Sequence, residues 1–92
     1  MGQARLKIYA ALGQAAGRTF DVDLPQPRVL IDLLRATATE LGFADKLFDQ
    51  SGRIKPSFTV LLNGTSVNYL DGLNTLVHDG DQVAVLAFVT GG

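Results

Sequence analysis

The sequence predicts an α+β domain in which one main helix covers one face of a mixed sheet of four to five strands, in the order β-β-α-β-β. Three observations indicate this class. Two stretches near the N-terminus alternate apolar and polar residues, a central stretch has apolar residues at helical spacing, and two further apolar strands follow. The 92 residues are enough for one core. We therefore expect a single domain over residues 1–92.

The first two strands are predicted to form a β-hairpin. In RLKIYAAL (residues 5–12) the apolar residues alternate with Lys7 and Tyr9, and in RTFDVDL (residues 18–24) they alternate with polar residues in the same way. The short connector GQAAG between them is flanked by glycines, which is typical of a hairpin loop.

The central helix is predicted to begin at Pro27, because a proline at the first helical position lacks only an N–H group that would be unpaired there anyway. This start makes Gln26 the N-cap residue, although glutamine is a poor cap. Gly42 suits the left-handed conformation that ends many helices. The apolar stripe of this helix consists of Val29, Leu30, Leu33, Leu34, Ala38 and Leu41.

The second half of the chain is predicted to hold a connection and two strands. In residues 43–56 we expect Phe43, Leu47 and Phe48 to form a short turn that packs under the helix. The strand SFTVLL follows and is turned by Asn63-Gly64, the strongest short hairpin signal. The last strand, QVAVLAFV, is expected to lie parallel to the first strand in the middle of the sheet.

Composition excludes several classes of function. The formal net charge is −1 and the eight basic residues are scattered, which argues against nucleic-acid binding. The chain has no cysteine, and no apolar run approaches the length of a membrane span. We also see no signal peptide at the N-terminus and expect a cytoplasmic protein with no membrane partner.

No catalytic or metal-binding constellation is evident among the side chains. His78 is the only histidine, and no serine or cysteine nucleophile completes a constellation with it. Asp45 and Asp49 lie four residues apart, yet without further ligands they make a poor metal site. We expect no bound metal and no bound cofactor.

The order of elements resembles a β-grasp, or ubiquitin-like, domain, and the C-terminal stretch LDGLNTLVHDGDQVAVLAFVTGG resembles the MoaD/ThiS family of sulfur-carrier proteins. The shared motifs are LLNG, the turn Asp79-Gly80-Asp81, the strand that follows it, and the final Gly91-Gly92. The likeness is greatest to MoaD-type members, the small subunits of molybdopterin synthase. Where those members commonly carry two prolines before the tail, this chain reads Leu86-Ala87-Phe88-Val89.

The resemblance implies that the reacting group is the C-terminal carboxylate of Gly92. A free carboxylate is inert to nucleophiles, and in this family an ATP-using, E1-like adenylating enzyme of the MoeB/ThiF type converts it to an acyl-adenylate. A sulfur donor then displaces AMP to leave a thiocarboxylate. Gly91 keeps the backbone thin enough to enter a narrow active site, because glycine has no Cβ atom. The resemblance also implies that the chain is not itself an enzyme, because the chemistry lies in the adenylating enzyme and in an acceptor enzyme. Residues 89–92 would form an extended tail.

The resemblance leaves several acceptors open. The leading expectation is sulfur donation to a molybdopterin synthase large subunit. The alternatives are a ThiS-like or cysteine-synthesis carrier, and a ubiquitin-like modifier that is conjugated to lysines. A β-grasp interaction domain with an incidental tail is a further alternative, because chain termini often have no role.

Strand alternation also predicts a surface for partners. If Val83 and Val85 face the helix, the intervening residues of the last strand face outward, together with Leu61. An exposed apolar patch of this kind marks an interaction site. The alternative is that the connection at residues 43–56, or a second copy of the chain, covers this face. The predicted partner-binding residues are Leu61, Ala84, Leu86, Phe88, Val89 and Thr90, with Phe88 as the expected hot spot.

Overall fold

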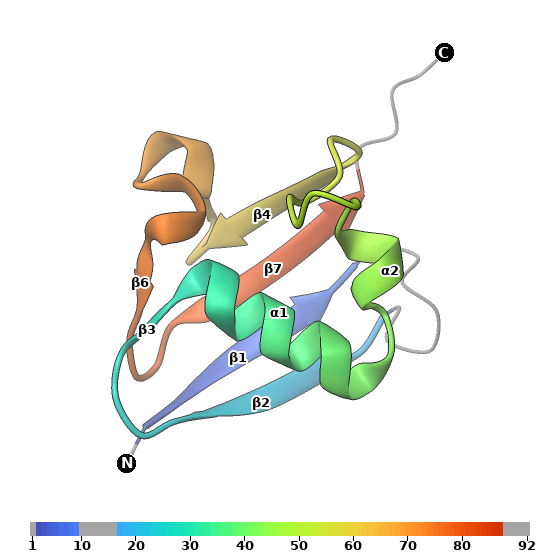
Figure 1. The fold of residues 1–92 in the computed structure, drawn as a ribbon. Coiled ribbons are helices and arrows are strands. Elements are labelled where there is room, and N and C mark those ends of the chain that lie inside the picture. The colour runs from blue at the N-terminus through green and yellow to red at the C-terminus, as the bar shows by residue number, and fades with distance from the viewer. Residues whose placement is uncertain (1, 10–16, 88–92) are drawn as a thin grey trace.

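The computed structural model describes residues 2–9 and 17–87. One long helix lies across one face of a mixed sheet, as Figure 1 shows. The main sheet has five strands in the order β2-β1-β7-β4-β5, and a second, two-stranded sheet pairs β3 with β6. The strands are β1 (Gly2–Ile8), β2 (Thr19–Leu24), β3 (Arg28–Val29), β4 (Phe58–Leu62), β5 (Thr65–Ser66), β6 (Leu76–Val77) and β7 (Gln82–Ala87).

The sheet has the predicted β-grasp arrangement. β1 and β2 form an antiparallel hairpin, and β1 and β7 pair in parallel at the centre, with Leu6 opposite Val83 and Ile8 opposite Val85. β4 is antiparallel to β7 on the other side. The helices are α1 (Leu30–Leu41) and the short α2 (Ala44–Leu47), and two 3₁₀ turns, η2 (Val67–Tyr69) and η3 (Gly72–Asn74), connect β5 to β6.

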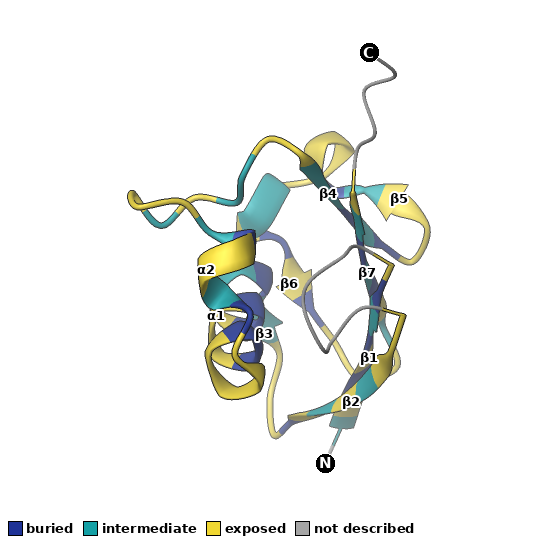
Figure 2. Cartoon of the chain, turned by 90° about the vertical axis from the view of Figure 1, so that its right-hand side faces the viewer, coloured by how far each residue is buried: buried dark blue, intermediate teal, exposed yellow. Residues whose placement is uncertain are grey.

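The hydrophobic core lies between α1 and the inner face of the sheet. Figure 2 shows the dark-blue buried residues of α1 facing those of β1 and β7. The predicted inward residues of the central strands are buried, and Phe58 of β4 is packed against the core while partly exposed. The buried apolar residues of the helical and central elements include Leu6, Ile8, Leu30, Leu33, Leu34, Ala38, Val60, Leu62, Val83 and Val85.

The predicted start of the helix was wrong. α1 begins at Leu30, with Val29 in an extended conformation (ψ 134°), and neither Pro27 nor Gln26 has the predicted role. Residues 28–29 instead pair with Leu76–Val77 as β3 and β6. This pairing between segments far apart in the sequence outweighs the helical preference of the apolar stripe. The predicted end was right, because Gly42 has the left-handed φ of 81°.

The connection at residues 43–56 packs on the helix side of the molecule, as Figure 2 shows. Phe43 and Leu47 are buried, and Phe48 pairs with Ile54 in an isolated bridge. The Asp49 carboxylate accepts hydrogen bonds from Ser51 Oγ (2.7 Å) and from the Arg53 N–H (3.0 Å). These bonds hold the pKa of Asp49 below its usual value. Because this connection lies on the helix side, it does not cover the outer face of the sheet.

No helix of the described residues is long and apolar enough to cross a membrane.

Candidate functional site

The outer face of the sheet carries an apolar surface beside the end of β7. Leu61 lies opposite Ala84 across β4 and β7, and Thr59 lies opposite Leu86. Leu61 and Leu86 are therefore diagonal neighbours on one face, a distance over which long side chains make contact. All four residues are half-buried. The sequence predicted Leu61, Ala84 and Leu86 to share this face, and the strand register brings them together.

Tyr9 joins this surface and was not predicted. Lys7 lies opposite Ala84 in the parallel β1–β7 pair, and the Tyr9 N–H donates to the Val85 carbonyl at 2.9 Å. Tyr9 follows Lys7 by two residues, so it lies beside Leu86 and is 60% exposed. The signal was present in the sequence, because Tyr9 alternates with the core residues of the first strand. We call Tyr9, Thr59, Leu61, Ala84 and Leu86 the outer patch.

The outer patch is less exposed than the sequence analysis predicted. Leu61 and Leu86 are half-buried because their neighbours on adjacent strands cover part of each side chain. Ala84 exposes little apolar surface because its side chain is small. The surface is therefore a shallow apolar strip with Tyr9 as its most exposed member. Aromatic residues of this kind are common interface anchors.

The predicted tail lies outside the described residues. This applies to Phe88, Val89, Thr90, Gly91 and Gly92. The structure does fix where they attach, because β7 is described up to Ala87, which pairs with Phe58 of β4. Leu86 of the outer patch thus lies six residues before Gly92 in the sequence.

The start of β7 is held by a network that joins the two predicted turn motifs. Asn63 Nδ2 donates to Asp81 Oδ1 at 3.0 Å, and the Gln82 N–H donates to Asn63 Oδ1 at 2.9 Å. The Gly80 N–H donates to the Gln3 carbonyl at 2.8 Å, which ties the turn to β1 as well. The network aligns β1, β4 and β7, and so it determines which residues of β7 face outward.

Replacing Asn63 by alanine is expected to destabilise the fold by about 1–2 kcal/mol. The change removes both side-chain hydrogen bonds, and it places a Cβ-bearing residue without a polar side chain at φ 52°, in the left-handed region. Urea unfolding monitored by circular dichroism measures the loss. Asn63→Gly is the control, because glycine accepts this φ and loses only the hydrogen bonds. Equal stability of wild type and both variants would contradict the role of the network.

His78 has no catalytic surroundings. Its Nδ1 lies 3.8 Å from Asp81 Oδ2, and its side chain is 59% exposed. Among the described residues, no group of three His, Cys, Asp or Glu side chains is placed to hold a metal ion. The Asp45 carbonyl accepts a hydrogen bond from Lys55 Nζ at 3.0 Å. His78 remains a solvent-exposed turn residue.

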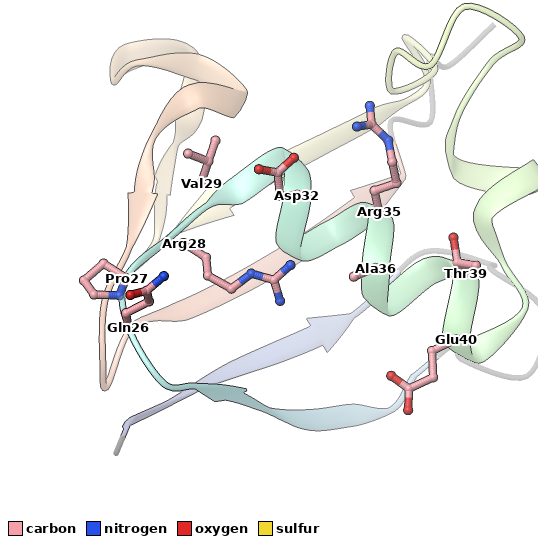
Figure 3. Close-up of a pocket in the computed structure, with 9 residues that line it drawn as sticks. All are labelled: Gln26, Pro27, Arg28, Val29, Asp32, Arg35, Ala36, Thr39 and Glu40. Atoms are coloured by element: carbon pink, nitrogen blue, oxygen red, sulfur yellow. The ribbon is translucent and has the colours of Figure 1, made fainter.

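One hollow in the described part of the chain runs along the exposed face of α1 (Figure 3). Its volume is about 790 Å³, and it is open to solvent. Its charged residues carry both signs, with Arg28 and Arg35 beside Asp32 and Glu40. Sites for small molecules are enclosed and mostly apolar, so this open hollow does not have the character of one.

Comparison with known proteins identifies the class. The β-grasp fold is that of solved small archaeal modifier proteins. The chain matches the ThiS family over residues 6–92 and belongs to that family.

Three similar proteins fit this assignment. A putative sulfur carrier protein of Archaeoglobus fulgidus is 28% identical over 90 residues, which cover 96% of this chain and 97% of the relative. Small archaeal modifier protein 3 of Haloferax volcanii is 44% identical over 62 residues, 66% of each chain. The crystal structure of SAMP1 from Haloferax volcanii superposes with a TM-score of 0.81 at 28% identity and covers 99% of this chain and 100% of the other.

Proposed function

We propose that the chain is a sulfur carrier whose reacting group is the carboxylate of Gly92. The observation that carries the proposal is the family match, which spans the β-grasp body and reaches residue 92. The A. fulgidus relative, named as a putative sulfur carrier, supports it along nearly the whole chain. We assign the chemistry to partner enzymes, because the relatives of this chain are named as a carrier and a modifier protein.

The carrier cycle has three balanced steps. An oxygen of the Gly92 carboxylate attacks the α-phosphorus of ATP in an adenylating enzyme, and pyrophosphate leaves. A hydrosulfide-level donor then attacks the carbonyl carbon, the bond to the AMP oxygen breaks, and a thiocarboxylate forms. Transfer of the sulfur to an acceptor, with water supplying the oxygen, regenerates the carboxylate. Gly91 and Gly92 present no Cβ atom to the enzyme channel.

The acceptor proposed first is the large subunit of a molybdopterin synthase. The motifs that support this choice are LLNG, Asp79-Gly80-Asp81 and the Gly-Gly end, which are shared with MoaD-type proteins. The structure gives the first two motifs a common purpose, because Asn63 and Asp81 bond each other at the start of β7. The absence of two prolines at residues 86–89 bears on how the chain docks to that subunit.

Protein modification is the second candidate. The relative of highest identity among those reported above, at 44%, is named as a small archaeal modifier protein. A modifier uses the same acyl-adenylate, but a lysine amine attacks the carbonyl carbon and AMP leaves with formation of an isopeptide bond. The two functions share the first step and differ in the nucleophile.

Adenylation is tested by ATP–pyrophosphate exchange with the adenylating enzyme of the same organism. We expect exchange of labelled pyrophosphate into ATP only when this chain is present. Capping the C-terminus with an amide provides the control, because the amide has no anionic carboxylate oxygen to attack the α-phosphorus. Exchange that is independent of the chain, or that persists with the amide, would overturn the proposal.

The outer patch is proposed to contact the partner enzymes. Replacing Leu86 by aspartate is expected to weaken binding to the adenylating enzyme by roughly 30-fold, because a charge is buried at an apolar contact. Isothermal titration calorimetry measures the change. Leu76→Asp is the matched control, since Leu76 is 48% exposed in β6 and lies outside the patch. Equal weakening by both variants would contradict a specific role for the patch.

A further inference from the structure

β2 forms an open edge of the five-stranded sheet. Among the described residues it pairs with β1 alone. The Ile8 N–H donates to the Arg18 carbonyl at 2.9 Å, and bonded positions recur at every second residue of an antiparallel pair. The backbone N–H and C=O groups of Phe20 and Val22 therefore make their hydrogen bonds to β1.

The intervening residues of β2 direct their backbone groups outward. These residues are Thr19, Asp21 and Asp23, and their N–H and C=O groups point away from β1. Natural proteins protect such edges with charged side chains, above all lysine, with proline or with a bulge, and the charges on this edge are Asp21 and Asp23. The span Thr19–Leu24 contains no lysine and no proline, and its register with β1 is regular throughout. The edge is therefore available for pairing.

A hollow of about 350 Å³ lies between this edge and α1. Its apolar lining consists of Phe20 and Val22 of β2, which are partly buried, and of Ala36 and Leu41 of α1. Polar and charged residues also line it: Asp21, Asp23, Arg28, Thr37 and Glu40. Figure 3 shows Glu40 projecting from α1 toward β2, whereas Thr39 points away. On the face of the sheet that carries α1, an added strand would find the apolar side chains of Val22 and Ala36 beside the charged side chains of Arg28 and Glu40.

The opposite face of the same edge is acidic. Asp21 and Asp23 project there, where Arg5 Nε lies 3.5 Å from Asp21 and the neutral Gln3 amide lies 3.2 Å from Asp23. The Arg5–Asp21 pair is exposed on both sides, so it offsets little of the negative charge. Asp23 has no cation among its recorded partners in the described residues.

These carboxylates disfavour pairing with a second copy of β2. An antiparallel junction that keeps both α1 helices on one face brings Asp21 and Asp23 of the two copies close to each other. Like charges opposite one another across strands are destabilising. The edge is therefore suited to a different strand, one that carries positive charge on its outer face.

We propose that β2 and the hollow beside α1 form a docking site for an extended segment of another protein, which adds a strand to the sheet. The segment alternates apolar residues, which enter the hollow against Val22 and Ala36, with basic residues, which face Asp21 and Asp23. Backbone hydrogen bonds to the open edge supply affinity, and the alternating pockets supply specificity. The site is separate from the outer patch and does not depend on the proposed function.

The test is an NMR titration of the ¹⁵N-labelled full chain with a short, capped peptide of alternating lysine and valine residues. We expect chemical-shift changes and slowed amide exchange at Thr19, Asp21 and Asp23. A peptide of alternating glutamate and valine is expected to bind about tenfold more weakly, because its charges repel the two aspartates.

Two pairs of variants separate the contributions. Asp21→Pro removes an edge N–H that β1 does not use, and Asp21→Ala removes only the charge. Ala36→Arg fills the hollow, and Thr39→Arg adds the same charge on the same helix outside it. Asp21→Pro and Ala36→Arg are each expected to weaken peptide binding about tenfold or more relative to their controls.

Four results would overturn the proposal: shifts centred on the outer patch, equal binding of both peptides, equal binding by each variant and its control, or no binding at millimolar peptide. A concentration-dependent dimer that forms through β2 would also overturn it, because the occupant would then be a second copy. The titration contains no adenylating enzyme or ATP. Its failure is therefore distinct from a failure of the proposed carrier function.

Discussion

Deletion of Gly92 is expected to abolish activation of the chain by its adenylating enzyme, with a loss of at least about 100-fold in the rate of adenylate formation. The deletion shortens the chain by about 3.3–3.6 Å, which is the extended length of one residue. Misplacement of a reacting group by about 1 Å already costs roughly 100-fold. Single-turnover formation of AMP in the presence of a sulfur donor measures the rate.

The deletion of Gly92 distinguishes a sulfur carrier from an interaction domain. Binding of the truncated chain to the adenylating enzyme is expected to change little, because the outer patch is intact. Its unfolding midpoint is expected to equal that of the full chain, since the described core ends before Phe88. Extension by one glycine is a matched control that moves the carboxylate in the other direction. Normal activation of the truncated chain would contradict the assignment of Gly92.

Replacing Phe43 by alanine is expected to destabilise the fold by about 3–5 kcal/mol, the range measured for buried phenylalanine. Phe43 is 1% exposed, and its N–H donates to the Ala38 carbonyl at 2.9 Å just beyond the end of α1. The truncation leaves a cavity between α1 and α2 that the backbone cannot close without moving the helix end. Urea unfolding at equilibrium measures the loss.

Phe48→Ala is the comparison for this prediction. Phe48 is only half-buried, and the Arg35 guanidinium lies 5.7 Å from the centre of its ring. Phe48→Ala is expected to lower the free energy of unfolding by about 1–2 kcal/mol, because it removes less buried apolar area than Phe43→Ala does. A cost at Phe43 no larger than that at Phe48 would contradict the view that residues 43–47 complete the core under α1.

The main elements of the fold could be predicted because they have local causes. The sequence shows the alternation of the first strands and the helical spacing of Leu30, Leu33 and Leu34. Asn63-Gly64 predicts the turn after β4, and Gly42 predicts the end of α1. The conformations at these positions follow from the residues themselves. The α+β layers then follow from covering one sheet face with one helix, and the β-grasp assignment rests on the resemblance of the element order to that fold.

The parts that sequence reasoning missed depend on partners far away in the chain. β3 forms by pairing with Leu76–Val77. Because of this pairing, α1 begins at Leu30 and not at the predicted Pro27. The bond between Asn63 and Asp81 joins two motifs that look independent in the sequence. No local pattern at either site contains this information.

The candidate site was predictable in part. Leu61, Ala84 and Leu86 follow from strand alternation. Alternation also separated Tyr9 from the core residues of the first strand, but Tyr9 was not assigned to the partner surface. The degree of exposure did not follow, because it depends on how neighbouring side chains cover each other. Phe88, Val89, Thr90, Gly91 and Gly92 lie outside the described residues, and their roles stay predictions.

The sulfur-carrier function is tested most directly by the intact mass of the chain after incubation with its adenylating enzyme, ATP and a sulfur donor. We expect a species in which one oxygen is replaced by sulfur, localised by fragmentation to Gly92. An unchanged mass with no AMP formed would contradict it and leave an interaction domain. AMP formation together with a lysine-linked product, and no thiocarboxylate, would assign the chain to the modifiers and contradict the carrier function.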